Sequence, residues 1–173
     1  MKIKTLLLAT VFMGAGALTA HAQGAKKSPK LTATGKVGDA TVSITYSSPS
    51  VKGRKIWGDL VPYDKVWRSG ANEASILETD KEIKIAGKKL PAGKYSLYTL
   101  PGEKEWQVIL NSQTGQWGVK RSGETTRNPE KNVLVVNVKP KHSDTMQESL
   151  VYLINPKEIV LKWENLEVPV PVK

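Results

Sequence analysis

Residues 94–110 read KYSLYTL-PGEK-EWQVIL, and this stretch decides the fold class. Apolar and polar side chains alternate through 94–100 and again through 105–110, which is the period of a β-strand with one buried face. The four residues between these runs include Pro101 and Gly102, which favour the connection of a hairpin. We therefore expect two antiparallel strands joined by a short turn.

The same alternation continues on both sides of this hairpin. The run TVSITY at 41–46 places Val42, Ile44 and Tyr46 on one face of a strand. The apolar run 133–138 is almost continuous, which predicts a strand covered on both faces. Breaks are expected at Asn155-Pro156 and Glu164-Asn165. Further strands are expected at 82–85, 149–154, 158–163 and 166–172.

Helical periodicity is weak throughout the chain after its N-terminal segment. A helical turn could form only within 57–67, where Gly58 and Pro62 interrupt it. About ten short strands separated by Gly and Pro predict an all-β fold with little helix. We expect an antiparallel β-sandwich-like arrangement, with a jelly-roll or a barrel as the alternative. The polar stretch 115–131 is predicted to be a loop.

The first 22 residues have the features of a cleavable signal peptide. Lys2 and Lys4 precede an apolar stretch, and Ala20-His21-Ala22 forms a small-x-small cleavage pattern. The apolar stretch has about 15 residues, fewer than the roughly 20 that span a bilayer, so we expect no membrane anchor after cleavage. The expected product is exported to the periplasm or beyond, with a flexible lead-in at 23–30 and one β-rich domain at 31–173.

The composition excludes several kinds of chemistry. The 173 residues contain no Cys and two His, so disulfides, thiolate nucleophiles and cysteine metal sites are impossible. Because cleavage after Ala22 would leave His142 alone, we expect no metal site. No phosphate-binding, dinucleotide-binding or calcium-loop pattern is present, so no cofactor is expected. Cleavage would lower the net charge from +10 to +8, and the basic residues are dispersed, which argues against a nucleic-acid partner.

Residues 49–73 differ from the rest of the chain because they combine cations, indoles, glycines and an amide. Arginine offers a planar donor fork for carboxylate or phosphate, an amide suits sugar hydroxyls, and indoles offer flat faces to rings. The pattern favours an anionic or polyhydroxylated small ligand, or an envelope glycan. A structural role is the alternative, with indoles in the core and an ion pair between Arg68 and Glu73. The candidate ligand-binding residues are Lys52, Arg54, Trp57, Trp67, Arg68, Asn72 and Glu73.

Three functional hypotheses follow from these residues. The leading one is a non-enzymatic ligand-binding module. The second is a hydrolase that uses Glu73 as general acid or base with Arg68 tuning its charge, which requires a second carboxylate or an activated water nearby. The third is a structural envelope protein that presents an edge strand to a partner. Adjacency in the sequence does not make His142, Ser143 and Asp144 a catalytic triad, because the members of a triad meet in space and need not be neighbours in the chain.

Five separated motifs resemble one known family. They lie at 47–58 (SSPSVKGRKIWG), 61–73 (VPYDKVWRSGANE), 90–111 (LPAGKYSLYTLPGEKEWQVILN), 116–118 (QWG), and Trp163 with 168–170 (VPV). The chain resembles the domain of unknown function 2911, a family of exported proteins found mainly in Bacteroidetes-type bacteria. Ser48 stands where that family more often has Arg. The resemblance covers nearly the whole of the chain that cleavage would leave. It implies the class of protein and its export from the cytoplasm, but it does not imply any reaction.

Overall fold

The computed structural model describes residues 28–173, so the expected signal peptide and lead-in residues 23–27 lie outside the described part. Ten strands and one short 3-10 helix form its regular structure. No helix within 28–173 is long and apolar enough to cross a membrane. The elements are β1 (Lys30–Val37), β2 (Ala40–Ser47), β3 (Ala71–Thr79), β4 (Ile83–Ile85), β5 (Lys88–Leu90), β6 (Gly93–Leu100), β7 (Trp106–Asn111), η1 (Pro129–Lys131), β8 (Asn132–Val138), β9 (Lys141–Ile154) and β10 (Glu158–Pro171).

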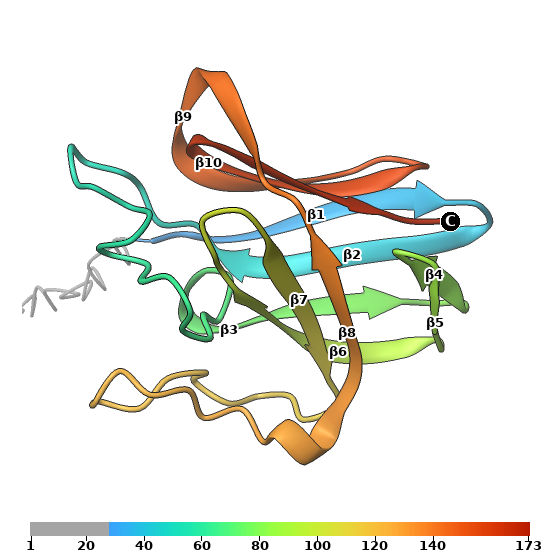
Figure 1. Cartoon of the computed structure of the whole chain (residues 1–173). Helices are drawn as coiled ribbons and strands as arrows, with labels where there is room; N and C mark the ends of the chain where they lie inside the picture. The colour runs from blue at the N-terminus through green and yellow to red at the C-terminus, as the bar shows by residue number, and fades with distance from the viewer. Residues whose placement is uncertain (1–27) are drawn as a thin grey trace, which may run out of the picture.

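Six of the strands form one antiparallel sheet in the order β1-β2-β3-β6-β7-β8 (Figure 1). The predicted hairpin is confirmed as β6 and β7, with Tyr98 opposite Ile109 and Leu97 opposite Leu110. Strand β3 joins the two halves of this sheet by pairing with β2 on one side and β6 on the other. The sheet therefore grows outward from the segment whose alternation is clearest in the sequence.

Strands β9 and β10 form a second, two-stranded antiparallel sheet that covers the first. Each is 14 residues long. The predicted break at Glu164-Asn165 is wrong: β10 continues through it, and the register shifts on both sides of Glu164. Glu164 has a φ of 55°, the left-handed conformation found in bulges. A bulge bends the strand without ending it, so the polar pair in the sequence marks a bend.

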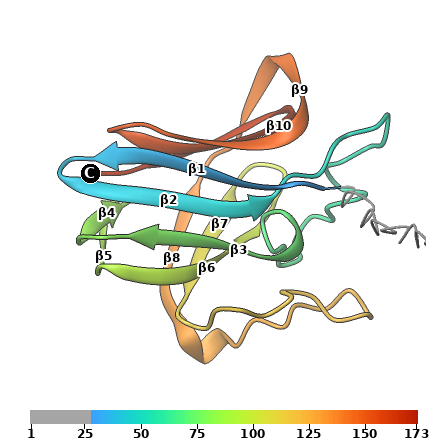
Figure 2. The same ribbon diagram turned by 180° about the vertical axis from the view of Figure 1, so that it is seen from behind.

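The β9–β10 sheet contacts both edges of the larger sheet, with β9 beside β1 and β10 beside β8. No strand pairing closes these two seams, so the all-β, sandwich-like prediction is confirmed and the structure is not a closed barrel (Figure 2). The first seam is narrow. A side chain at Gly35 in β1 would collide with the carbonyl oxygen of Ile154 in β9. Glycine lets the two backbones approach at that point.

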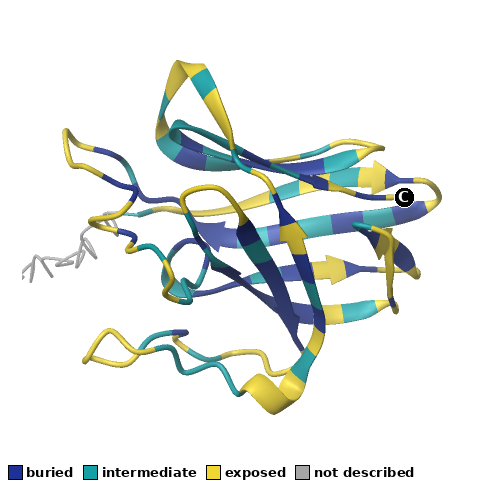
Figure 3. Ribbon diagram, viewed as in Figure 1, coloured by how far each residue is buried: buried dark blue, intermediate teal, exposed yellow. Residues whose placement is uncertain are grey.

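The core fills the space between the two sheets, and burial alternates along the strands (Figure 3). Val42, Ile44 and Tyr46 of β2 are all buried, as predicted. The expectation that 133–138 is covered on both faces is wrong: β8 is an edge strand, and Val133 is 43% exposed. The run is apolar for two reasons. One face of β8 is buried, and the other face carries valines, which favour the β conformation even where they are exposed.

Four of the five tryptophans form one cluster beside the core. Trp57 packs edge-to-face against Trp106 and Trp163, with ring centroids 5.0 and 5.7 Å apart. Trp67 stacks on Trp163 at 5.9 Å with an angle of 19° between the rings. The members come from the 48–70 connection, β7 and β10. The cluster therefore ties three distant parts of the chain together at one end of the sandwich.

Candidate functional site

An open groove of about 750 Å³ lies at the end of the sandwich opposite the C-terminus. Two loops that project in the same direction form its walls (Figure 1). We call residues 50–61 the first prong and residues 118–126 the second prong. Drug-sized ligands occupy pockets of roughly 300–1,000 Å³. By contrast, the hollow between the sheets that Ile44, Leu97 and Leu110 help to line is about 30 Å³ and almost wholly apolar, which is too small for a ligand of that size.

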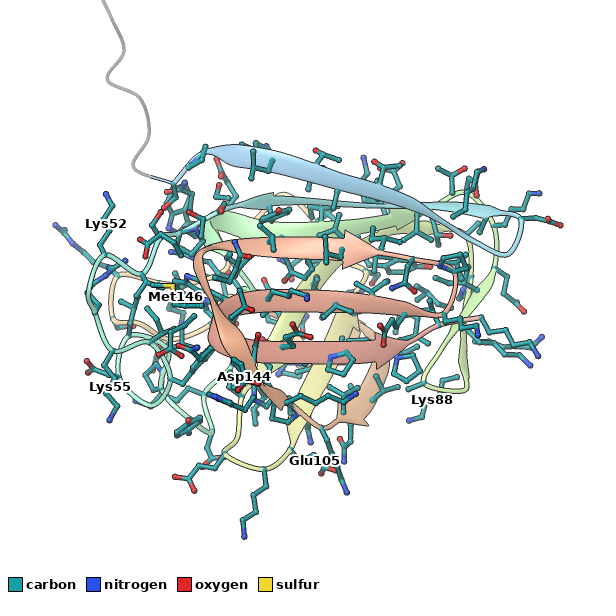
Figure 4. All side chains as sticks on the ribbon, turned by 90° about the horizontal axis from the view of Figure 1, so that it is seen from above. Lys52, Lys55, Lys88, Glu105, Asp144 and Met146 are labelled. Carbon is teal, nitrogen blue, oxygen red and sulfur yellow. The ribbon has the colours of Figure 1, made fainter. Side chains whose placement is uncertain are left out.

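The first prong is fixed at its base by β9. The amide of Leu150 donates to the carbonyl of Pro49 at 2.9 Å, and the amide of Val51 donates to the carbonyl of Glu148 at 2.8 Å. The Ser48 hydroxyl is buried and donates to the Leu150 carbonyl at 2.7 Å. Lys52 at the tip has a φ of 49°, a conformation uncommon outside glycine. Figure 4 shows Lys52 and Lys55 at this end of the molecule and Lys88 toward the other end.

The segment after the first prong holds Trp67 and Arg68 against the sheet. Trp67 pairs with Thr99 of β6 through two backbone hydrogen bonds, of 2.7 and 2.9 Å. Ser69 is fully buried with a φ of 55°, and its carbonyl accepts from the hydroxyl of Tyr152 at 2.8 Å. A buried, left-handed serine persists only where its surroundings enforce it. These contacts therefore fix the direction in which Trp67 and Arg68 leave the backbone.

The stacked indoles of Trp67 and Trp163 both line the groove. Trp67 is partly exposed and its Nε1 donates to the carbonyl of Gly70 at 3.1 Å. Trp163 is 1% exposed and lies beneath it. Because the ring of Trp67 is supported from behind by a second ring, its orientation is set before any ligand arrives. A rigid aromatic face of this kind suits a sugar ring or another flat group.

Arg68 is a half-buried cation on the groove wall. Burial lowers the pKa of its guanidinium, and attraction to Glu73 and to Tyr98 opposes that change. Within residues 28–173 no carboxylate forms an ion pair with Arg68. Its Nη1 donates to the Trp117 carbonyl at 3.4 Å, and its guanidinium lies 5.6 Å from the Trp117 ring centroid. A partly desolvated guanidinium with spare donors is a strong attractant for an anion.

The second prong is seated on the outer face of the larger sheet by the side chains that precede and follow it. Gln116 donates to the hydroxyls of Tyr98 and Ser96 at 2.8 and 3.0 Å. Arg127 donates to the Asn132 side chain at 2.7 Å. The prong itself is a small hairpin with a bridge between Val119 and Thr125. The predicted loop at 115–131 is therefore a loop as far as Asn128, fixed at both ends, and its last three residues form η1.

Gly118 lies where the second prong meets Arg68. It has a φ of 90°, and a Cβ added there would lie 2.9 Å from the Cβ of Arg68 and 3.1 Å from that of Ala74. Gly118→Ala should therefore lower the free energy of unfolding by about 2–4 kcal/mol. The loss has two causes: alanine is strained in the left-handed conformation, and its methyl group is too close to Arg68 and Ala74. Denaturant unfolding measures this change.

Gly123 provides the matched control for Gly118. Its φ is 87°, but nothing lies within 4 Å of an added Cβ. Gly123→Ala should carry only the backbone penalty, about 1–2 kcal/mol. If both variants lost the same free energy of unfolding, the close approach between Gly118 and Arg68 would contribute nothing to the effect of Gly118→Ala.

The structure brings together three of the seven candidate residues. Arg54, Trp67 and Arg68 line the groove. Arg54 also caps its own turn, donating to the carbonyls of Ser50 at 2.6 Å and Val51 at 3.0 Å. Lys52 is exposed on the first prong, outside the groove lining.

The other three candidates lie elsewhere. Trp57 is buried in the indole cluster. Asn72 and Glu73 belong to β3, and the Asn72 amide donates to the Ser28 carbonyl at 3.2 Å. Glu73 lines a separate hollow of about 150 Å³ together with Lys30 and Gln116. The expected ion pair between Arg68 and Glu73 is replaced by attraction over a longer distance.

Sequence reasoning did not assign several groove residues to the site. Lys65 and Trp163 lie within family motifs that assign them no role, and the second prong lies within the polar stretch 115–131. Trp117, 52% exposed beside Arg68, carried a visible signal because a lone indole in a polar loop is uncommon. Within residues 28–173 no group of three or more His, Asp or Glu side chains could hold a metal ion.

The chain is thus an all-β, sandwich-like protein with a basic, indole-floored groove at its loop end. It belongs to the family described as protein of unknown function (DUF2911), whose model matches residues 28–172. No match was found among curated proteins or solved structures. Family membership confirms the resemblance of the five motifs. Because that family description carries no activity, a function has to be argued from the groove.

Proposed function

We propose that the protein binds an anionic small molecule or glycan fragment in the groove and performs no chemistry on it. The observation that carries this proposal is Arg68, a half-buried cation without a carboxylate partner among the described residues, on the wall of a 750 Å³ groove. Arg54 and Lys65 add positive charge to the same lining, and Glu124, the acid in that lining, is paired with Lys120 at 3.2 Å.

The floor of the groove supports a ligand that also carries a ring. The face of Trp67 is partly exposed and its position is fixed by Trp163. Leu60, 44% exposed, adds an apolar contact at the edge. A carboxylate or phosphate near Arg68 and a sugar or similar ring on Trp67 would use both features at once. An acidic sugar combines these two groups in one molecule.

The proposal is tested by thermal-shift screening followed by calorimetry with sugars, peptidoglycan fragments and anionic metabolites, N-acetylmuramic acid and glucuronic acid included. A bound compound should raise the melting temperature of the wild type. Arg68→Ala should weaken its binding about tenfold or more, because a charge-assisted hydrogen bond is lost. Arg68→Lys should fall between the two, since it keeps the charge and loses the fork.

Lys84→Ala provides the control, because Lys84 is exposed and lies beside the C-terminal residues, far from the groove. It should bind as the wild type does. Circular dichroism confirms that each variant is folded. A compound that stabilises wild type and Arg68→Ala equally would bind somewhere else, and the proposed site would be wrong.

The two alternative functions have less support. A hydrolase using Glu73 needs a second carboxylate or an activated water, and the described lining of the Glu73 hollow contains no other acid. An envelope protein that pairs through an edge strand needs a long open edge. The 14-residue strands β9 and β10 lie against β1 and β8, the two edges of the larger sheet, and the carbonyl of Val135 in β8 already accepts from Lys88 at 2.9 Å. Neither alternative is favoured by a specific contact.

We also propose that the protein acts outside the cytoplasm, after cleavage following Ala22. Residues 31–173 would then serve as one β-rich domain. The support is the sequence pattern of residues 1–22 together with the family of exported proteins that the motifs resemble. Mass spectrometry of the exported product would test the cleavage position, which should leave Gln23 as its first residue.

A further inference from the structure

The tips of both prongs carry exposed cations. The first prong presents Lys52 and Lys55, and the second presents Lys120 and Arg121. Each tip contains a tight turn. The amide of Arg54 donates to the carbonyl of Val51 at 3.1 Å, and the amide of Gly123 donates to the carbonyl of Lys120 at 3.0 Å. Both prongs project past the rest of the sandwich at the same end of the molecule (Figures 1 and 2). The groove therefore lies between two basic tips.

Most of these cations form no ion pair, although the carboxylate of Glu148 accepts from the backbone amide of Lys52 at 3.0 Å. Lys120 forms an ion pair with Glu124, whereas Lys52, Lys55 and Arg121 form none with the described carboxylates. On the body of the sandwich, Lys89, Lys94 and Lys162 each pair with a glutamate, but Lys84 and Lys157 form no ion pair with the described carboxylates either. The tip cations are therefore distinguished by their position on both sides of the groove. The side chains at the tips are thus available to an anion that comes from outside the protein.

Exposed lysines cannot hold a small anion by themselves. A solvent-exposed charge pair contributes little to binding and is screened by salt. Several weak contacts to one molecule behave differently, because the first contact raises the local concentration of every later one. The tip cations are therefore useful only to a ligand that is long enough to occupy the groove and reach past it.

We infer that the ligand is a polyanionic chain of ring units, with one part stacked in the groove and flanking anions held by the two prong tips. This inference rests on the proposed function, since it names the substrate class of the same groove. Arg68 and the supported face of Trp67 would hold the central unit. The exposed indole of Trp117 offers a neighbouring unit a second flat face beside Arg68.

The experiment measures binding as a function of chain length. Galacturonic acid and oligogalacturonates of two to ten units are titrated into the exported protein by calorimetry, and polyphosphate of similar charge serves as a chain without rings. We expect the longest oligogalacturonate to bind at least tenfold more tightly than galacturonic acid. Polyphosphate should bind at least tenfold more weakly than that oligogalacturonate, because it cannot stack on an indole.

Two matched double variants separate the tips from general charge. Lys55→Glu/Arg121→Glu reverses one exposed cation on each prong. Lys84→Glu/Lys157→Glu reverses two exposed cations beside the C-terminal residues, at the opposite end. The first pair should lower affinity for the longest oligogalacturonate at least tenfold and change that for galacturonic acid less than twofold. The second pair should change both less than twofold.

The outcomes distinguish this inference from the proposed function. Equal affinity at every length, with binding abolished by Arg68→Ala, would overturn the polyanionic chain and leave the small-ligand groove standing. If both double variants lowered the affinity for the longest oligogalacturonate equally, the tip cations would act only through nonspecific attraction, and the inference would be overturned. Absence of uronate binding at every length, or tighter binding of polyphosphate, would overturn it as well. Loss of length dependence confined to Lys55→Glu/Arg121→Glu would support it.

Discussion

Trp163→Ala should lower the free energy of unfolding by about 3–5 kcal/mol, the cost expected for deleting a buried tryptophan. The side chain is 1% exposed and contacts Trp57 edge-to-face and Trp67 in a stack. Its removal would leave a cavity between the two sheets and would free the ring of Trp67 on the groove floor. Denaturant unfolding monitored by circular dichroism measures the loss.

Trp117→Ala is the control for that variant. Trp117 is 52% exposed, and its ring contact is with the guanidinium of Arg68. Its removal should cost no more than about 1 kcal/mol, the usual strength of an exposed cation–π contact. A loss for Trp163→Ala as small as that for Trp117→Ala would mean that the indole cluster does not hold the two sheets together. Ligand binding should weaken in Trp163→Ala even where the protein remains folded.

Local periodicity predicted those parts of the fold that local contacts decide. The 94–110 hairpin was predicted with its turn because alternation and turn residues act within a few positions. The continuity of β10 was not, because Glu164 can serve as a turn or as a bulge and only the neighbouring strand selects between them. The exposure of β8 likewise depends on its place at a sheet edge, which no residue within 133–138 encodes.

The candidate site was predicted in part for a similar reason. Arg54, Trp67 and Arg68 are close in sequence and also meet in space. Asn72 and Glu73 follow Arg68 by only a few residues, but β3 begins at Ala71, and Glu73 lines a separate hollow instead of the groove. Trp163 comes from β10, about a hundred residues away in sequence. Sequence proximity identifies one wall of the groove and the exposed ring on its floor, whereas the supporting ring of Trp163 and the opposite wall depend on the tertiary fold.

Raising the pH above 10 should destabilise the protein steeply. Burial raises the pKa values of Tyr46, Tyr98 and Tyr152 in the folded state. Unfolded tyrosine has a pKa of about 10. Between that pH and the higher folded values, the native state keeps protons that the unfolded chain has released. Stability from these phenols is therefore complete below pH 10 and is lost as pH rises.

Tyr152 should contribute the largest part of this loss. It is buried against Tyr46, with ring centroids 4.8 Å apart, and its hydroxyl donates to the carbonyl of Ser69. An ionised phenol can no longer donate that hydrogen bond, and its charge has no cation beside it among the described contacts. By pH 12 the loss from Tyr152 alone should reach about 2–3 kcal/mol. Denaturant unfolding at intervals between pH 8 and 12 measures it.

Tyr152→Phe separates this group from the other bases that titrate in the same range. At pH 8 the variant should be less stable than wild type by about 1–2 kcal/mol, because a buried hydrogen bond is removed. Above pH 10 its stability should fall less steeply, so the two curves approach each other and can cross. Lysines release protons in both proteins, and their contribution cancels in the difference. Parallel curves up to pH 12 would show that the Tyr152 phenol does not govern the alkaline loss. Because the folded protein keeps the Tyr152 proton over this interval, the hydrogen bond to Ser69 next to Arg68 should persist, and ligand binding should fall only in proportion to the unfolded fraction.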